Sequence, residues 1–316
     1  MPKVYILILN YKRWRDVAAC LEALFQSSYT HFTAIVIDND SDNQSLEHLM
    51  NWADQPASCT AGAIHKPISY EYYKSSCLLH TISLNSLPQL LLVQNEMNKG
   101  FAGGINTVLK YFLEENAFIW LLNPDIIVQK STLSELVKYA ESHNKNSIIG
   151  CVIKQYTKPG KIHTYGGGKI NFRSATVQFI TDKKDVGNLD YISGGSLFTH
   201  AGTYADVGLL PEDYFLYWEE TDWCCRAKKK GYKLLVCETA ICYDKISTSI
   251  GKNYLSDYYY TRNGLLFISK FGNHQVKTAV FFIMLRIVKR LATGKWNRAR
   301  GMYNGMKAFF NNNANQ

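Results

Sequence analysis

The chain has 316 residues, of which 47% are hydrophobic and 13% aromatic, which is enough for a sizeable core and excludes a disordered chain. The formal net charge of +9 is unevenly distributed, because residues 258–316 contain ten of the 35 Lys and Arg and no Asp or Glu. Such a basic segment typically meets phosphate on nucleic acid or on a membrane surface, and the balanced charge of residues 1–257 speaks against nucleic acid as the main partner.

The start of the chain, MPKVYILILNYKRW, is not typical of a signal peptide. Its apolar run covers only residues 4–9 and is followed by Asn and Tyr instead of a small-residue cleavage site. No uncharged apolar run approaches the roughly 18 residues that a membrane span needs. The eight cysteines form no CxxC pair, and several lie in apolar runs, so we interpret them as reduced core residues of a cytosolic protein.

The first 122 residues alternate between predicted strands and predicted helices. Short apolar runs predict buried strands at residues 4–9, 33–38, 88–95 and 118–122. Residues 17–25 have apolar positions at helical spacing, and residues 101–113 begin with glycines and continue as a helical pattern. Both segments predict helices between the strands. This alternation indicates a mostly parallel sheet with helices on both faces.

The remaining segments fit this rhythm less regularly. Residues 54–87 mix Ser, Pro, Tyr, Cys and His without clear periodicity, and we interpret them as an insertion before the third strand. A helix at 131–142 and a strand at 147–153 are predicted next, followed by glycine-rich turns in a more antiparallel region. The polar end NNNANQ is predicted to be disordered.

Polar clusters follow three of the predicted strands. They are Asn10-Tyr11, Asp38-Asn39-Asp40 and Asn123-Pro124-Asp125. Asn, Pro and Asp are common turn residues, so each cluster alone fits a turn. In open α/β sheets, however, ligands bind at the carboxyl ends of the strands, and three such clusters in a row indicate a ligand site there.

A second acidic cluster lies in YFLYWEETDWCCRAKKKGYK, where Glu219, Glu220 and Asp222 begin a predicted helix that Gly231 ends. Acids at the start of a helix and basic residues at its end suit the helix macrodipole, which is a structural explanation. Flanking aromatic side chains can instead desolvate a carboxylate and raise its pKa, as a general base requires. The residues alone leave both explanations open.

Seven segments, in this order, resemble the motifs of inverting family 2 glycosyltransferases with the GT-A fold. They are VYILILNYKRW, IVIDNDSDN, NKGFAGGIN, WLLNPDIIV, ISGGSLF, FLYWEETDWCCRAKKKGYK and YYYTRNGLL. They are most similar to bacterial rhamnosyltransferase-type members that build O-antigen and other surface polysaccharides. The resemblance implies a Rossmann-like α/β catalytic domain over residues 1–257, with 54–87 as an insertion, and a basic, amphipathic helical region over 258–316.

The resemblance also implies a donor site for a nucleoside-diphosphate sugar, carried on dTDP or UDP. Asp125 would bind Mg²⁺ or Mn²⁺, hard cations that take oxygen ligands. Asp244 stands about where relatives carry a metal-binding His, and a surface ion pair is the alternative for it. Arg262 would contact the diphosphate or the acceptor, and a place on a polar helix face is the alternative. The other positions that match donor-binding motifs are Asn10, Asp38, Asn39, Asn98, Lys99, Gly100, Gly103, Gly104, Asn106 and Asn123. Glycines allow close backbone approach to a ligand, although Gly103 and Gly104 equally suit tight strand–helix packing.

The segment EETD matches the EDxD of relatives, whose second acid lies near the acceptor. Glu220 would therefore be the catalytic base that deprotonates the acceptor hydroxyl. Because this sequence carries Glu where Asp is commoner, the longer side chain leaves Glu219 and Asp222 as alternatives.

The basic C-terminal region predicts interfacial helices over residues 275–310. At 100° per residue, Arg286, Lys289 and Arg290 lie on one side, and the apolar Phe281, Met284, Val288 and Leu291 lie opposite. Such a helix suits an anionic membrane surface and a lipid-linked glycan acceptor, which predicts a peripheral protein on the inner face of the cytoplasmic membrane. Packing of the apolar face on the catalytic domain is the alternative.

Two other function classes fit parts of the chain. A nucleotidylyltransferase would also use an α/β sheet, a divalent metal and nucleoside phosphates, but the chain has no early Gly-rich loop with Arg and Lys to hold a triphosphate. A non-enzymatic membrane-surface adaptor would need only the basic tail.

Overall fold

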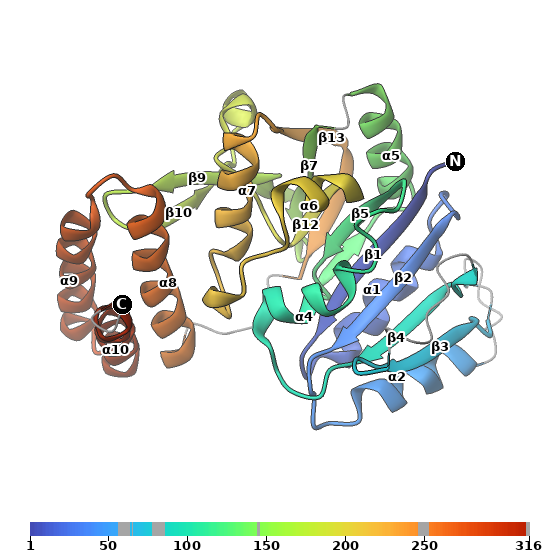
Figure 1. Cartoon of the computed structure of the whole chain (residues 1–316), viewed down its shortest axis with the longest axis horizontal. Coiled ribbons are helices and arrows are strands. Elements are labelled where there is room, and N and C mark those ends of the chain that lie inside the picture. The colour runs from blue at the N-terminus through green and yellow to red at the C-terminus, as the bar shows by residue number, and fades with distance from the viewer. Residues whose placement is uncertain (56–63, 65, 78–85, 144–145, 246–252, 314–316) are drawn as a thin grey trace.

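The computed structural model describes most of the chain (Figure 1). The described residues are 1–55, 64, 66–77, 86–143, 146–245 and 253–313. Among them, a ten-stranded mixed sheet forms the centre, with a small three-stranded sheet beside it and a group of helices at the C-terminal end.

One half of the large sheet is parallel. Its strands are, in spatial order, β3 (Tyr70–Lys74), β4 (Leu90–Gln94), β2 (Phe32–Asp38), β1 (Lys3–Asn10) and β5 (Ala117–Leu122). The register aligns Asn10 with Asp38, and Asp38 with Gln94. The polar residues that follow these strands therefore meet at one edge of the sheet.

The other half of the large sheet is mixed. Strand β12 (Ser196–His200) runs antiparallel between β5 and β7 (Ser147–Gln155), which in turn pairs in parallel with β13 (Lys233–Asp244). The short β6 (Ile126–Val128) pairs antiparallel with β13, and β8 (Lys158–Tyr165) pairs antiparallel with β7. The segment after Asp125 thus lies against the end of β13.

Helices cover both faces of the sheet, because alternate strand residues point to opposite sides. In β1, Val4, Ile6 and Ile8 pack into one core, while Tyr5 and Leu7 pack into the other. The first core is covered by α1 (Trp14–Phe25), α2 (Ser45–Asp54) and α5 (Thr132–Ser142). The second is covered by α4 (Gly100–Leu109), α6 (Ala201–Val207) and α7 (Glu219–Lys229).

The small sheet lies between the large sheet and the C-terminal helices (Figure 1). The sheet consists of β9 (Gly167–Asn171) paired antiparallel with β10 (Thr176–Phe179) and β11 (Tyr191–Ile192). The 3₁₀ turns are η2 (Lys183–Asn188) and η3 (Glu212–Tyr214). The antiparallel pairing here agrees with the prediction made from the glycine-rich turns.

Three helices end the chain: α8 (Tyr254–Phe271), α9 (Val276–Ala292) and α10 (Trp296–Asn313). They form a third core, into which Trp218 also packs. Gly301 and Gly305 let α10 cross α8 closely, since a Cβ at either position would overlap a backbone carbonyl, of Tyr254 or of Tyr258. Within the described residues, no helix combines the length and the apolar character needed to cross a membrane.

The α/β fold class is confirmed, and the differences from prediction are local. Strand β3 lies within the stretch interpreted as an insertion and extends the parallel sheet at its edge. Helix α4 ends at Leu109 because the chain then turns to bury Phe112 against the ring of Tyr5. Helix α10 continues to Asn313, so the polar end predicted to be disordered is helical over its first three residues.

Candidate active site

Asn10 and Asp38 form a buried pair at the ends of β1 and β2. The Asn10 amide donates to Asp38 Oδ1 at 2.6 Å, and the backbone N–H of Ser41 donates to Asp38 Oδ2 at 3.0 Å. The Asn10 side-chain oxygen accepts from the backbone N–H of Arg13. Burial raises the pKa of Asp38, and the hydrogen bonds from Ser41 and Asn10 oppose this shift. Both side chains lie at the predicted edge of the sheet, and their hydrogen bonds with Ser41 and Arg13 hold the adjoining loops.

Asn39 connects β2 with the loop that precedes α4. Its amide donates to Asn98 Oδ1 at 2.8 Å and to the carbonyl of Gly100 at 3.0 Å. Its side-chain oxygen accepts from the amide of Asn95 and from the backbone N–H of Lys99. The side chains of Asn39 and Asn98, which the resemblance assigned to the nucleotide-sugar, therefore already hydrogen-bond within the protein.

The predicted donor-site glycines lie at close packing positions. Gly100 has φ +71°, and a Cβ there would overlap the carbonyl of Phe215, whose oxygen accepts from the N–H of Phe101. A Cβ on Gly104 would lie 2.5 Å from the Leu9 side chain on β1, and one on Gly103 would lie 2.9 Å from Lys99 Cβ. This geometry favours strand–helix packing for Gly104, whereas Gly103 lies against Lys99 and Glu212 and not against a strand.

Asn106 fixes the segment that leads to the second acidic cluster. Its amide donates to the carbonyl of Leu210 at 2.8 Å and to Glu212 Oε1 at 2.9 Å, and its oxygen accepts from the Leu210 N–H. The side chain is buried. Asn106 thus holds the 210–212 segment against α4.

Asn123 and Asp125 lie at the tip between β5 and β6. The backbone N–H of Asn123 donates to the carbonyl of Gly195, and the N–H of Ile126 donates back to the Asn123 carbonyl, which closes the turn. Asp125 is buried, and its backbone carbonyl accepts from the N–H of Lys245 at 3.2 Å. The turn predicted from Asn-Pro-Asp exists, and it places a carboxylate at the sheet edge.

Asp244 lies beside this turn, since its Cα is paired with that of Ile126 across β13 and β6. Its Oδ2 is 3.6 Å from His163 Nε2. Within the part of the chain that the structure describes, no three His, Cys, Asp or Glu side chains converge as a metal site. Mg²⁺ and similar ions are nevertheless commonly held by one or two carboxylates together with substrate phosphates. The role of Asp125 and Asp244 as metal ligands therefore stays a prediction.

A charged group that the sequence did not predict lies near Asp125. Asp16 on α1 accepts from Arg13 at 2.6 Å and pairs with Lys245 at 3.2 Å. Arg13 lies in the motif VYILILNYKRW and Asp16 follows it on α1, whereas Lys245 comes from a segment far along the chain. They place two cations at the same edge as the predicted diphosphate site.

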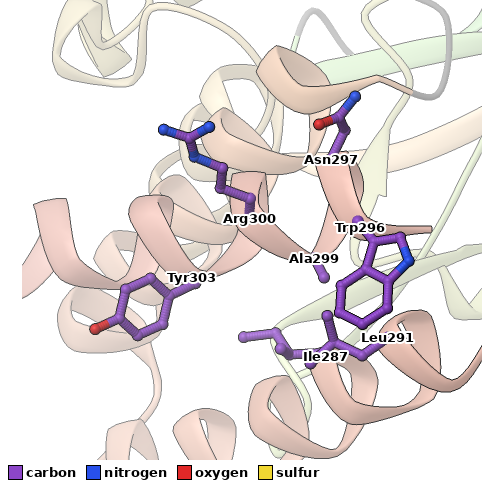
Figure 2. A pocket seen from close by; sticks show the side chains of 7 residues that line it. All are labelled: Ile287, Leu291, Trp296, Asn297, Ala299, Arg300 and Tyr303. Atoms are coloured by element: carbon purple, nitrogen blue, oxygen red, sulfur yellow. The ribbon is translucent and has the colours of Figure 1, made fainter. Parts of the chain in front are cut away.

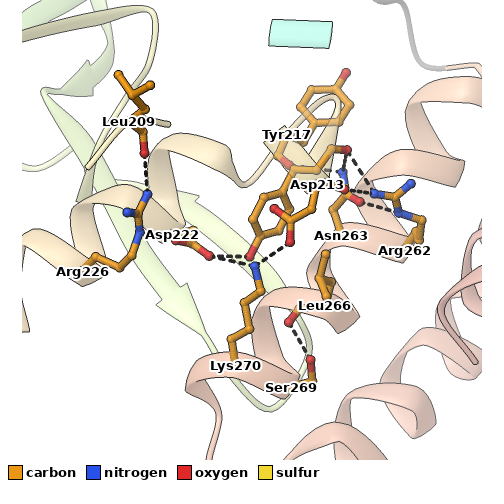
Figure 3. A network of polar contacts seen from close by, with 11 residues as sticks. Leu209, Asp213, Tyr217, Asp222, Arg226, Arg262, Asn263, Leu266, Ser269 and Lys270 are labelled. Carbon is orange, nitrogen blue, oxygen red and sulfur yellow. Dashed lines mark hydrogen bonds and ion pairs between the residues drawn. The ribbon is translucent and has the colours of Figure 1, made fainter. Parts of the chain in front are cut away.

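Asp222 is fully engaged inside the protein (Figure 3). Its Oδ1 accepts from Arg226 Nε at 2.9 Å, and its Oδ2 accepts from the Tyr214 hydroxyl at 2.8 Å and pairs with Lys270 at 3.4 Å. The side chain is only 3% exposed. Asp222 therefore links α7, the 214 loop and α8, which matches the structural explanation for this acid.

Glu219 and Glu220 are the first two residues of α7. Glu219 is 3% exposed, and its Oε2 has no hydrogen-bond partner among the described residues. Burial, and then the charge of Glu220, raise the pKa of Glu219 well above its ordinary value. Burial also raises the pKa of Glu220, while the backbone N–H groups of Glu220, Gly194 and Thr221 oppose this shift.

Glu220 faces the glycine turn between β11 and β12. A Cβ on Gly194 would lie 3.6 Å from Glu220 Cγ, and Gly195 accepts the hydrogen bond from Asn123 described above. The Gly194-Gly195 turn thus connects the acidic helix start with the Asn123–Asp125 turn. This turn lies in the segment ISGGSLF, which resembles a family motif but in which no site residue was predicted.

The loop before Glu219 has an unusual backbone. Phe215, Tyr217 and Trp218 have φ values of +66°, +67° and +80°, which non-glycine residues adopt at an energetic cost. Asn263 on α8 holds this loop by donating to the carbonyls of Tyr214, Leu216 and Tyr217 (Figure 3).

Arg262, the neighbour of Asn263, is also bound to this loop. Its guanidinium donates to the carbonyls of Asp213 and Tyr214 and to Asn263 Oδ1 (Figure 3). It also lies over the ring of Tyr259. The residue predicted to contact the diphosphate or the acceptor thus already makes loop contacts within the protein.

The overall fold matches that of solved GT-A glycosyltransferases. The mannosyltransferase PcManGT from Pyrobaculum calidifontis, solved with GDP-Man and Mn²⁺, superposes with a TM-score of 0.57 at 13% identity, over 98% of this chain and 84% of that one. Two helix-covered sheet faces and polar residues at the strand ends agree with this class.

The sequence comparisons show which proteins the chain is similar to. Residues 79–200 match the model of glycosyl transferase family 2. It is 23% identical over 237 residues to the low-salt glycan biosynthesis hexosyltransferase Agl10 of Haloferax volcanii, covering 74% of this chain and 64% of that protein. It is 24% identical over 151 residues to the rhamnosyltransferase WbbL of Escherichia coli K12, covering 43% of this chain and 56% of that protein. The chain thus spans less than two thirds of the length of both relatives.

Proposed function

We propose that this protein transfers a sugar from a nucleoside-diphosphate sugar to an acceptor hydroxyl with inversion at the anomeric carbon. The observation that supports the proposal is the Gly194-Gly195 turn, which packs against Glu220 and accepts a hydrogen bond from Asn123. A carboxylate with a raised pKa beside a carboxylate that can hold a metal–diphosphate is the pair that this reaction needs.

In the proposed reaction, Glu220 takes the proton from the acceptor hydroxyl. The acceptor oxygen forms a bond to the anomeric carbon as the bond from that carbon to the diphosphate oxygen breaks. The nucleoside diphosphate leaves with the electron pair of the broken bond. Glu219 keeps its own proton because of its buried position, and this lets Glu220 ionise without a like charge beside it.

Asp125, with Asp244 beside it, is proposed to hold Mg²⁺ or Mn²⁺. When bound, such an ion neutralises charge on the leaving diphosphate. Mn²⁺ was bound in the PcManGT structure, which supports a divalent ion here. Arg13 and Lys245 are the described cations best placed to assist the diphosphate.

We further propose that the protein acts in the synthesis of a bacterial surface polysaccharide. Rhamnose is supported by similarity to one rhamnosyltransferase, while similarity to a hexosyltransferase and a mannosyltransferase supports other hexoses. The proposed donor nucleotide is dTDP or UDP, and the proposed acceptor is a glycan, carried on a lipid.

Association with the inner face of the cytoplasmic membrane is proposed from α9. Its residues Ala279, Ile283 and Ile287 face the protein, whereas Phe281 and Val288 are 59% and 58% exposed. An apolar face left exposed beside cations suits the surface of an anionic bilayer.

Release of nucleoside diphosphate tests this proposal. The protein should hydrolyse or transfer from at least one of a panel of dTDP-, UDP- and GDP-sugars when Mn²⁺ or Mg²⁺ is present, and EDTA should abolish the release. Formation of inorganic diphosphate from a nucleoside triphosphate and a sugar phosphate would instead identify a nucleotidylyltransferase.

Asp125→Ala should abolish the metal-stimulated release and leave the melting temperature nearly unchanged, because the residue lies at a strand tip. Glu47→Ala, at an exposed position on α2, is the matched control for losing a carboxylate. Turnover at the wild-type level in Asp125→Ala would show that Asp125 serves only the turn.

A further inference from the structure

The end of the α9–α10 hairpin carries two neighbouring hollows of different chemistry. One, of about 480 Å³, is mostly apolar (Figure 2), and it is lined by Ile287, Leu291, Trp296, Asn297, Ala299, Arg300 and Tyr303. The other, of about 290 Å³, is cationic, and it is lined by Arg286, Lys289, Arg290, Thr293, Lys295 and Arg298. Lys295 lines the cationic hollow and the next residue, Trp296, lines the apolar one, so both hollows include residues at the start of α10.

The cationic hollow is only partly neutralised by the protein. Asp257 on α8 pairs with Arg290 and, at 2.7 Å, with Arg298. In the described part of the chain, no carboxylate forms an ion pair with Arg286, Lys289 or Lys295. One carboxylate thus faces five cations, and an anion would lower their mutual repulsion.

Arg286 is one of the half-buried cations of this hollow. Its Nη2 donates to the carbonyl of Ser174, but its Nε is buried and has no hydrogen-bond partner among the described residues. Burial lowers the pKa of Arg286, and the like charge of Arg290 adds to this shift. A buried guanidinium N–H without an acceptor is costly, and a phosphate oxygen would satisfy it.

The apolar hollow indicates what carries the anion. Trp296 is 66% exposed at its rim, and the exposed Phe281 and Val288 lie on α9. A nucleic-acid backbone would require a row of cations, whereas here one cationic hollow adjoins apolar surface. An apolar chain attached to a phosphate matches both hollows.

We propose that the end of the α9–α10 hairpin is a binding site for a lipid phosphate. The phosphate or diphosphate occupies the hollow of Arg286, Lys289 and Lys295, and the hydrocarbon chain lies against Trp296 and Leu291. This proposal rests on the proposed function in one respect, because a lipid-linked acceptor is one source of the lipid phosphate.

One side chain relates this site to the carboxylates of α7. Tyr260 is half-buried, and its hydroxyl accepts from the backbone N–H of Val177, three residues after Ser174, whose carbonyl accepts from Arg286. The backbone carbonyl of Tyr260 accepts from the indole N–H of Trp218, which directly precedes Glu219. A lipid phosphate held at Arg286 would therefore lie near the helix that carries the proposed base.

Calorimetric titration of the full chain, without a donor, tests the site with three probes. Farnesyl diphosphate supplies both chemistries, inorganic diphosphate only the charge, and farnesol only the chain. We expect farnesyl diphosphate to bind at one saturable site. Inorganic diphosphate and farnesol should each bind at least tenfold more weakly. Equal affinity for inorganic diphosphate would refute the role of the apolar hollow, and no saturable binding of farnesyl diphosphate would refute the proposal.

A pair of double variants separates the site from general charge attraction. Lys289→Ala with Lys295→Ala removes two exposed cations from the hollow, and Lys277→Ala with Lys307→Ala removes two exposed cations elsewhere on the same hairpin. Because charge-assisted hydrogen bonds to the diphosphate would be lost, the Lys289/Lys295 variant should bind farnesyl diphosphate roughly tenfold or more weakly. The Lys277/Lys307 variant should lose less than about twofold. Equal losses in both would overturn the proposal.

Competition identifies the source of the ligand. If vesicles with phosphatidylglycerol displace farnesyl diphosphate and pure phosphatidylcholine vesicles do not, the site takes a membrane headgroup. If neither displaces it, the site takes the diphosphate of a lipid-linked acceptor. Because no donor is present, failure of these titrations would leave the glycosyl-transfer proposal untouched, and failure of nucleoside-diphosphate release would leave the site untouched.

Discussion

Three acids within four residues have different surroundings, and these surroundings separate their roles. Asp222 has partners for both oxygens, Glu219 is buried with an oxygen that lacks a partner in the described structure, and Glu220 faces the glycine turn. Sequence could place all three at the start of a helix. It could not rank them, because Tyr214, Arg226 and Lys270 reach Asp222 from other elements or from the next turn of the helix.

Glu219→Gln should change how stability depends on pH. Because the pKa of Glu219 is raised, the folded protein keeps a proton that the unfolded chain releases above the ordinary glutamate pKa of about 4.3. The free energy of unfolding therefore falls as pH rises above that value. The melting temperature of Glu219→Gln should fall less between about pH 5 and about pH 8 than that of the wild type.

Glu47→Gln, at an exposed position on α2, is the control and should follow the wild-type curve. If Glu219→Gln also follows that curve, Glu219 is ionised in the folded protein. The proposed division of charge between Glu219 and Glu220 would then be wrong.

At the scale of elements, the strands of the centre were predictable and the edge was not. Residues 4–9 and 33–38 are continuous apolar runs because both faces of their strands are covered. Strand β3 has the sequence YEYYK and lies at the edge, half exposed, so it lacks such a run. The Asn39 hydrogen bonds and the Arg13–Asp16–Lys245 group were also not predictable, since they join segments that meet only in the folded chain.

Asn263→Ala should loosen the strained loop before α7. The three carbonyls that Asn263 binds would lose their donor, which should lower the free energy of unfolding by about 2 to 3 kcal/mol. Transfer activity should fall roughly tenfold in the folded variant, because the loop positions Glu220. Chemical denaturation and transfer kinetics measure the two effects.

Asn304→Ala provides the matched control, since Asn304 donates to the Tyr254 hydroxyl on the far part of α8 and does not touch the loop. It should lose some stability and keep its activity. Normal activity in folded Asn263→Ala would mean that the backbone strain in this loop has no part in catalysis.

At the scale of the whole molecule, the C-terminal helices are both part of the fold and a candidate surface for docking. Helix α10 packs closely on α8, so removal of the hairpin would expose the core that Trp218 joins. Substitutions on the exposed face are therefore the better test of membrane binding. The basic composition predicted this surface, but only the structure showed that α9 buries Ala279, Ile283 and Ile287 and leaves the adjoining apolar face open.

Phe281→Ser combined with Val288→Ser should release the protein from anionic vesicles. Burial of each side chain would contribute about 1.5 kcal/mol or more, so the partition coefficient should fall at least about tenfold. Tyr156→Ser, which changes an exposed aromatic residue on the catalytic domain, should have no effect. Unchanged vesicle binding by the double variant in a sedimentation assay would exclude this face as the membrane contact.

The central claim is that Glu220 is the base that acts on the acceptor, and transfer kinetics combined with donor titration on Glu220→Gln test it most directly. This substitution keeps the size of the side chain and removes its basicity, so transfer should fall by roughly 10²- to 10⁴-fold. Donor affinity should stay nearly unchanged, since the base contributes in the transition state. Wild-type transfer by Glu220→Gln, or loss of its donor binding, would contradict the claim.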